Sequence, residues 1–195
     1  RDRSEAVHVM RIISGKFKGT GLASVGKGDS AAHLRPTTDR VRESIFNLLV
    51  NGGYGDPITD ARVLDLFAGT GALGFEALSR GAAYVLFIDE GTKSRALIRQ
   101  NIDILRAIGA SKLFRRNATK LGPIVGEPYD LVFLDPPYGK GLGEKALISV
   151  RDGGWLADGA LIVWEEGSEQ VVPDGFDLLD ARKYGDTWVH ILRLL

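Results

Sequence analysis

The sequence contains no cysteine, one methionine and only three histidines among its 195 residues. Without cysteine, the protein can neither form a disulfide nor bind a metal through thiolates, and this composition is typical of a cytoplasmic protein. The three histidines, His8, His33 and His190, do not have the spacing of a metal-ligand set. We therefore expect a cytoplasmic protein without a metal site.

Long hydrophobic runs are also missing. No apolar stretch approaches the ~20 residues that a membrane-spanning helix needs, and no signal-peptide pattern is present. The hydrophobic share of 44% is nevertheless high enough for one globular domain with a substantial core. Residues 1–9 precede the only methionine, Met10, and show no core pattern, so we expect a tag or a disordered extension there.

The formal net charge is zero, which by itself argues against a nucleic-acid partner. The charges are unevenly distributed, however, because residues 10–42 carry +5 and residues 43–195 carry −5. A basic segment beside a mildly acidic body is typical of nucleic-acid binding, although an ordinary solvated surface gives the same pattern. The basic residues of the segment are Arg11, Lys16, Lys18, Lys27, Arg35, Arg40 and Arg42.

The pattern of apolar residues divides the chain after its first nine residues. Within 10–50, an alternating stretch at 11–22 predicts a small hairpin, and Thr37 or Thr38 can cap a helix that reaches Val50. Residues 51–195 alternate strand and helix patterns, which predicts a parallel, doubly wound α/β sheet. The predicted strands are 62–67, 84–89, 112–115, 129–134 and 160–165, and the predicted helices are 72–80, 92–108, 143–150 and a short one at 119–125. Two last segments, 176–183 and 187–194, predict an antiparallel hairpin.

A glycine-rich turn follows the first strand of this body. Residues 69–74 fit the dinucleotide fingerprint G-x-G-x-x-G, and the predicted helix begins directly behind them. Gly69 and Gly71 allow the backbone to approach a ligand closely, and a helix N-terminus favours polar or anionic groups. The alternative is a tight strand-to-helix turn that needs glycine for structural reasons alone.

The next strand ends in Asp89 and Glu90, about 20 residues after the glycines. An acidic side chain at this distance accepts hydrogen bonds from the ribose hydroxyls of a nucleotide cofactor. A solvated acidic turn is the alternative, but the spacing favours the ribose role, with Asp89 ahead of Glu90.

The most informative stretch is the apolar strand that ends in Asp135, Pro136, Pro137 and Tyr138. Proline fixes φ near −65°, has no N–H and restricts the residue before it, so the two prolines end the strand and make a stiff loop. This loop is rich in hydrogen-bond acceptors and carries an aromatic ring. It is suited to holding a planar group that bears an –NH2, although a proline-rich turn without function is the alternative.

Together these motifs resemble the class I S-adenosylmethionine-dependent methyltransferases, and in particular those that methylate amino groups. Four blocks, residues 10–19, 34–46, 135–141 and 182–187, look like the bacterial 16S rRNA guanine-N2 methyltransferase D family. The resemblance covers nearly the whole chain from Met10 onward. It implies a Rossmann-like fold with a seven-stranded, mostly parallel sheet that ends in an antiparallel pair. It also implies methyl transfer to the exocyclic N2 of a guanine in small-subunit rRNA, and we expect this rRNA to be bound within a ribosomal particle.

The resemblance further implies the roles of individual residues. Asp135 to Tyr138 would form the catalytic loop, with Asp135 and the Pro136 carbonyl accepting from the amine and Tyr138 stacking on the base. Asn117 stands where the family usually has an acidic residue, and it could still accept from the adenine amine. The implied cofactor-binding residues are Asp65, Phe67, Ala68, Gly69, Thr70, Gly71, Asp89, Glu90, Asn117 and Ala118. The implied RNA-binding residues are Arg11, Lys16, Lys18, Arg35, Arg40, Arg42 and Lys140.

Three other functions remain open from the sequence. Enzymes that methylate adenine N6 or cytosine N4 of DNA or RNA also carry Asp-Pro-Pro-Tyr loops. A dinucleotide-dependent oxidoreductase would use Gly69 to Gly74 but would leave Asp135 to Tyr138 unexplained. A catalytically silent RNA-binding module is the third. We expect a monomeric methyltransferase that uses S-adenosylmethionine, with residues 10–50 contacting RNA and residues 51–195 forming the catalytic domain.

Overall fold

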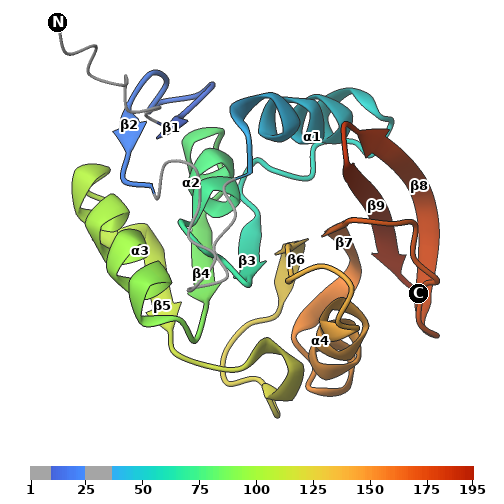
Figure 1. The fold of residues 1–195 in the computed structure, drawn as a ribbon. Helices are drawn as coiled ribbons and strands as arrows, with labels where there is room; N and C mark the ends of the chain where they lie inside the picture. The colour runs from blue at the N-terminus through green and yellow to red at the C-terminus, as the bar shows by residue number, and fades with distance from the viewer. Residues whose placement is uncertain (1–9, 25–36) are drawn as a thin grey trace, which may run out of the picture.

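A seven-stranded sheet forms the centre of the computed structural model, which describes residues 10–24 and 37–195 (Figure 1). The strand order is β5-β4-β3-β6-β7-β9-β8, and only β9 runs against the others. The strands are β3 (Arg62–Leu66), β4 (Tyr84–Ile88), β5 (Ser111–Phe114), β6 (Tyr129–Leu134), β7 (Leu156–Glu166), β8 (Phe176–Tyr184) and β9 (Thr187–Leu194). The predicted parallel α/β sheet with a final antiparallel hairpin is confirmed.

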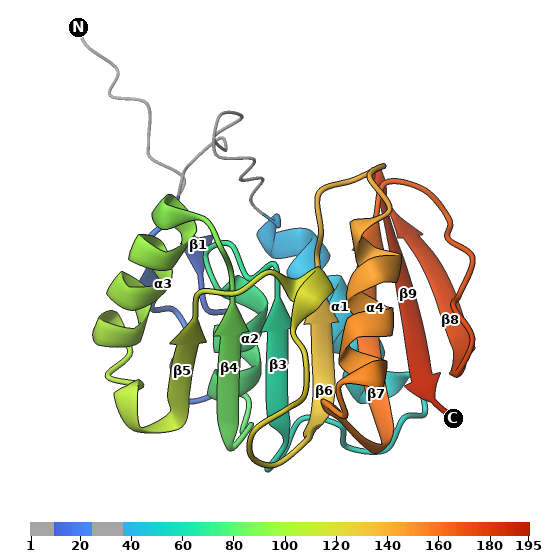
Figure 2. The same cartoon turned by 90° about the horizontal axis from the view of Figure 1, so that it is seen from below.

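Helices cover both faces of the sheet. Helices α1 (Asp39–Asn51), α2 (Ala72–Ser79) and α3 (Thr92–Ile104) lie on one face, and α4 (Leu142–Asp152) lies on the other. In Figure 2, which views the sheet face-on, α4 lies in front of the strands and α1 and α2 lie behind them. The five neighbouring strands β5, β4, β3, β6 and β7 run parallel, so their carboxyl ends meet at one edge of the sheet. None of the helices in the described part of the chain is long and apolar enough to cross a membrane.

Two predicted helices are shorter than expected. The helix expected at 92–108 ends at Ile104, because Arg106 adopts a left-handed conformation and the Ala107 N–H turns back to the Ile102 carbonyl at 2.9 Å. This is a common helix-ending arrangement, which apolar periodicity does not reveal. The helix expected at 119–125 is only a 3-10 turn at Ala118–Lys120.

The core consists of two apolar layers, one on each face of the sheet. The strands β3, β4 and β6 are buried on both faces, which explains their nearly continuous apolar sequences. The layer beneath α1, α2 and α3 also contains Met10, Ile12 and Leu22 from the N-terminal segment. The N-terminal segment therefore shares one core with the sheet.

The N-terminal segment forms a small hairpin that is hydrogen-bonded to the C-terminal end of α2. Its strands, β1 (Met10–Arg11) and β2 (Gly21–Leu22), have two residues each. In the turn, the Lys16 N–H donates to the Ser79 carbonyl at 2.9 Å. Gly15 has a φ of +87°, and a Cβ there would lie 1.9 Å from the Ser79 oxygen. Only glycine allows this close approach, so the hairpin is held in one position on α2.

A buried carboxylate, Glu76 of α2, links the N-terminal hairpin to the helices. Its two oxygens accept the N–H groups of Ile13 at 2.7 Å and Ser14 at 3.2 Å. Arg80 Nε lies 3.0 Å from one oxygen, and Arg42 Nε lies 3.5 Å from the other. Glu76 itself is fully buried. One side chain therefore joins the hairpin, α1 and α2.

This arrangement corrects the prediction for Arg42. Arg42 was expected to contact RNA, but its side chain is fully buried. Its Nη2 donates to the Arg11 carbonyl and to Asp39 Oδ1, the latter at 2.9 Å. A guanidinium in this position stabilises the fold and is not accessible to a phosphate.

Candidate active site

A cavity of about 390 Å³ lies at the edge where the parallel strands end. Loops that follow β3, β4, β5 and β6 line it, as expected for open α/β sheets, whose ligands bind at the carboxyl ends of the strands. Predicted site residues that line it are Asp65, Phe67, Ala68, Gly69, Thr70, Asp89, Glu90, Ala118, Asp135, Pro136, Pro137 and Lys140. The cavity thus brings the glycine turn and the Asp135 loop together.

The glycine turn after β3 has an unusual backbone. Phe67, Gly69 and Gly71 all have positive φ, at 54°, 59° and 80°. A Cβ on Gly71 would lie 2.5 Å from a ring carbon of Phe75, so a side chain does not fit there. Helix α2 then begins at Ala72, and its N-cap residue, Gly71, has no side chain to cap it. The N–H groups of the first helical turn therefore lie directly behind the glycine turn.

Asp65 is buried within β3, just before this turn. Its Oδ2 accepts the Gly74 N–H at 3.1 Å. Burial raises the pKa of Asp65 well above its usual value, and the charges of Asp135 and Asp89 raise it further. Three carboxylates, Asp65, Asp89 and Asp135, therefore lie close enough to repel one another in a poorly solvated region. A cationic ligand would reduce this repulsion.

Asp89 connects the loop after β4 to the glycine turn. Its Oδ2 accepts the Gly69 N–H at 2.9 Å, and its Oδ1 accepts the Gly91 N–H at 2.8 Å. Partial burial raises the pKa of Asp89 despite these hydrogen bonds. The Ser94 side chain also interacts with this carboxylate. A carboxylate has about four acceptor positions, so these three partners leave about one for a ligand. Glu90, beside it, is exposed.

The pairing of β3 with β6 brings Asp135 to the glycine turn. Leu66 is opposite Leu134, so the residues that follow each strand emerge side by side. The Asp135 N–H contacts the Leu66 carbonyl at 3.4 Å, and Thr37 Oγ1 donates to Asp135 Oδ2 at 3.3 Å. Asp135 is half-buried and lines the cavity. Asp135 therefore lies in the same cavity as the turn.

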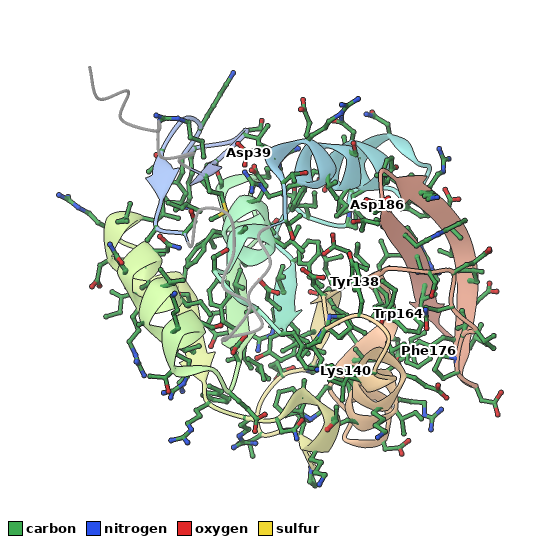
Figure 3. All side chains as sticks on the ribbon, viewed as in Figure 1. Asp39, Tyr138, Lys140, Trp164, Phe176 and Asp186 are labelled. Carbon is green, nitrogen blue, oxygen red and sulfur yellow. The ribbon has the colours of Figure 1, made fainter. Side chains whose placement is uncertain are left out.

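Tyr138 has a different position from the rest of its loop. It is not among the residues that line the cavity. Its hydroxyl donates to Thr187 Oγ1 at 3.2 Å, at the start of β9. Figure 3 labels Tyr138 together with Lys140 of the same loop and Asp186 of the β8–β9 turn. The ring therefore lies between the loop after β6 and the C-terminal hairpin.

Asn117 caps a local turn and is not among the residues that line the cavity. Its Oδ1 accepts from the Thr119 N–H at 2.9 Å and from Thr119 Oγ1 at 2.7 Å, and so caps the 3-10 turn. Both neighbours, Arg116 and Ala118, line the cavity, whereas Asn117 does not. Its carbonyl is thus already occupied by local donors, as is common for asparagine at such a position.

Two buried polar residues that were not predicted support the site. Asn101 of α3 donates to the Thr70 carbonyl at 3.0 Å and exchanges hydrogen bonds with the backbone of Ala23. Glu166, the last residue of β7, lies near the backbone N–H of Gly139. Burial raises the pKa of Glu166, and the charge of Asp135 adds to the shift. An asparagine on the buried face of a helix was a usable sequence signal, whereas Glu166 looked like an ordinary strand end.

The predicted RNA-binding residues differ in accessibility. Arg11, Lys16 and Lys18 of the hairpin, Arg40 of α1 and Lys140 are all exposed. Lys140 also lines the cavity. Arg35 and Lys27 lie outside the described residues. Within residues 10–24 and 37–195, no group of three histidines, aspartates or glutamates is arranged to hold a metal.

The sheet order, the reversed β9 and the cavity beside the glycine turn define a class I methyltransferase, and the chain is an enzyme of this class. The family described as Conserved hypothetical protein 95 matches residues 10–193. The chain belongs to this family.

Relatives in the family support the assignment. The chain is 41% identical to the Ribosomal RNA small subunit methyltransferase D of Escherichia coli over 164 residues, which cover 84% of this chain and 78% of the relative. The protein of the same name from Haemophilus influenzae is 33% identical over 181 residues, covering 90% and 89%. The solved Escherichia coli protein yhhF has a TM-score of 0.78 and 34% identity, covering 95% of this chain and 98% of that one.

Proposed function

We propose that this protein transfers the methyl group of S-adenosylmethionine to the exocyclic N2 of a guanine in small-subunit rRNA. One observation carries the proposal: Asp135, Pro136 and Pro137 line the same cavity as the glycine turn. A methyl donor in the turn and an amine held by the loop would then be in direct contact. The names of the curated relatives, which are small-subunit rRNA methyltransferases, support the choice of RNA. Assembling particles are a suitable substrate to test.

The charges around the cavity suit this cofactor. S-adenosylmethionine carries a sulfonium and an ammonium group, and Asp65 and Asp89 have raised pKa values because they are poorly solvated. A cationic ligand nearby would stabilise the charged form of both carboxylates and lower their pKa values. Asp65 would bind the ammonium group, the backbone of residues 67–71 the methionine part, and Asp89 the ribose. The adenine would lie against Ala118 and Arg116, without the Asn117 side chain.

We expect Asp65→Asn to stabilise the fold and weaken the cofactor complex. The raised pKa means that Asp65 is charged in the folded state at neutral pH only at a cost in free energy. Stability from this group is complete below the unfolded pKa near 3.8 and is lost as pH rises through the folded pKa. The variant should therefore melt at a higher temperature at neutral pH, and its advantage should shrink as pH falls toward that value.

The same variant should bind S-adenosylmethionine about 10- to 100-fold more weakly, because it loses a hydrogen bond to a charged group. Thermal unfolding at several pH values and calorimetric titration measure the two effects. A variant with lower stability and unchanged affinity would contradict the role of Asp65.

The Asp135 loop would orient the guanine amine, which is a weak nucleophile. The N2 lone pair of guanine is delocalised into the ring, so the amine needs orientation. The Asp135 carboxylate and the Pro136 carbonyl would each accept one N–H and turn the lone pair toward the methyl group. Alignment of two reactants can contribute up to about 7–11 kcal/mol. The nitrogen gains the methyl group, the sulfonium becomes a thioether, and one amine proton passes to Asp135 or to water.

Access to the base requires the nucleotide to leave its stack, as for other enzymes that act on bases. Tyr138 would then stack on it, a contact worth about 1–3 kcal/mol. Residues 10–50 would contact the surrounding RNA, and residues 51–195 would carry the chemistry. The exposed cations Arg11, Lys16 and Lys18 support this division, and Arg42 is not part of it.

We expect reversal of Arg11, Lys16 and Lys18 to glutamate to weaken RNA binding about tenfold or more at fixed salt. Each lost phosphate contact also lowers the slope of log affinity against log salt by about 1. Affinity for S-adenosylhomocysteine should change little. Reversal of Lys112, Lys120 and Arg193, which are exposed elsewhere, provides the matched control. Equal RNA affinity of the hairpin variant and the control would reject the contact.

A further inference from the structure

Tyr138 is held from two directions by the C-terminal part of the sheet. Its hydroxyl donates to Thr187 Oγ1 at 3.2 Å. Its ring lies against the backbone of Gly167, where an added Cβ would come within 2.7 Å of Cδ2 and 3.2 Å of Cγ. Gly167 has no left-handed φ, so the close approach of the ring, and not backbone strain, is what excludes a side chain there.

The two contacts come from neighbouring strands. Gly167 follows Glu166 at the end of β7, and Thr187 begins β9. Glu166 pairs with Trp188 in the antiparallel register, so Gly167 and Thr187 adjoin at the same edge. Figure 3 places the Tyr138 label between Trp164 of β7 and Asp186 of the hairpin turn. The tyrosine thus bridges the loop after β6 and the end of the β7–β9 pair.

The backbone just beyond the tyrosine lies near a buried carboxylate. Burial raises the pKa of Glu166, and the backbone N–H of Gly139 opposes this shift, so Gly139 lies close to the end of β7. The prolines restrict the chain on the other side of Tyr138, because both have a fixed φ. Tyr138 is therefore constrained by the prolines before it, by Gly167 against its ring and by Thr187 at the tip of its side chain.

These contacts decide which side of the ring can meet a base. The Gly167 backbone covers one side, so a stacked base must approach the other. A ring whose tilt is already set loses less conformational entropy when the base arrives. A tyrosine without these contacts would lose side-chain entropy when the base binds, and binding would be weaker.

We propose that Thr187 and Gly167 are positioning residues that orient Tyr138 for stacking on the target base. This inference rests on the function proposed above. It gives the end of the C-terminal hairpin a part in substrate recognition, whereas Thr187 and Gly167 lie outside the residues that line the cavity. It also predicts that they affect the RNA substrate and leave the cofactor unaffected.

The test is a set of steady-state measurements with a small-subunit particle as substrate. Thr187→Val keeps the branched side chain and removes the hydroxyl, and should lower kcat/KM for RNA roughly 3- to 10-fold, the effect of one hydrogen bond. Tyr138→Phe should have the same effect, and the double variant should show no further loss. Thr187→Ser keeps the hydroxyl that accepts from Tyr138 and should therefore have nearly the kcat/KM of the parent. Affinity for S-adenosylhomocysteine and the melting temperature should stay close to those of the parent.

Gly167→Ala tests the ring contact separately. The added methyl group must displace the ring, so this variant should lose more activity than Thr187→Val. The loss should disappear when Tyr138 is already alanine, because no ring remains to be displaced.

The outcomes separate the inference from the proposed function. An active parent with unchanged kcat/KM in Thr187→Val, or with additive losses in the double variant, would overturn the positioning role alone. A parent that binds the cofactor but methylates no rRNA would overturn both.

Discussion

Asp135→Ala is expected to lower kcat for methyl transfer by about 100- to 10,000-fold, the range for removal of a positioned acid or base. The variant loses the acceptor that orients the amine and one route for its proton. Binding of S-adenosylmethionine should change little, because the glycine turn, Asp65 and Asp89 provide the cofactor contacts. Single-turnover transfer and calorimetric titration measure the two effects separately.

The variant Asp135→Asn separates the role of Asp135 as a hydrogen-bond acceptor from its role as a proton acceptor. Its carbonyl can still accept an N–H, but it carries no charge and cannot take the proton, so an intermediate rate is expected. Asp158→Ala serves as the control, because Asp158 is an exposed carboxylate of β7 outside the cavity. Near-normal turnover in Asp135→Ala would show that this residue does not orient the amine.

Glu76→Ala is expected to have the largest effect on folding, a loss of about 3–5 kcal/mol in the free energy of unfolding. This is the usual result when one partner of a buried ion pair is removed. Arg42 would remain fully buried with only the partly exposed Asp39 as a counter-charge, and the N–H groups of Ile13 and Ser14 would lose their acceptors. The N-terminal hairpin should therefore loosen together with α1.

Urea unfolding of the two proteins measures this loss. Glu76→Gln keeps the shape and an acceptor oxygen, so it should be destabilised less than the alanine variant. Glu127→Ala, at an exposed position, should stay within about 0.5 kcal/mol of the parent. A loss below about 1 kcal/mol in Glu76→Ala would mean that the hairpin does not depend on this carboxylate.

The fold was largely predictable because its strands are short apolar runs between glycine turns. The β6 strand was predicted with its observed bounds, since the prolines after Leu134 mark its end. Local interactions beyond apolar periodicity caused the errors. The left-handed Arg106 ended α3 early, and the hydrogen bonds of Asn117 made a 3-10 turn in place of a helix.

The candidate site was predictable where a backbone motif defines it and less so where tertiary contacts do. The glycine turn and the Asp135 loop are contiguous motifs, and both line the cavity. Arg42 looked like a surface cation, because charge counts cannot distinguish an exposed guanidinium from one paired with a buried Glu76. That glutamate was itself a signal, as the only charged residue of the apolar helix α2. The partners of Tyr138, which are Thr187 and Gly167, lie far from it along the chain, so no local sequence pattern indicates these contacts.

The most direct test is transfer of tritium from labelled S-adenosylmethionine to small-subunit particles that lack the modification, followed by nucleoside analysis. The account predicts that label enters the RNA, that it is recovered as N2-methylguanosine, and that Asp135→Ala abolishes the signal. Label in methylated adenine or cytosine, or none in RNA while S-adenosylhomocysteine still binds, would contradict the assignment of guanine N2 to this cavity.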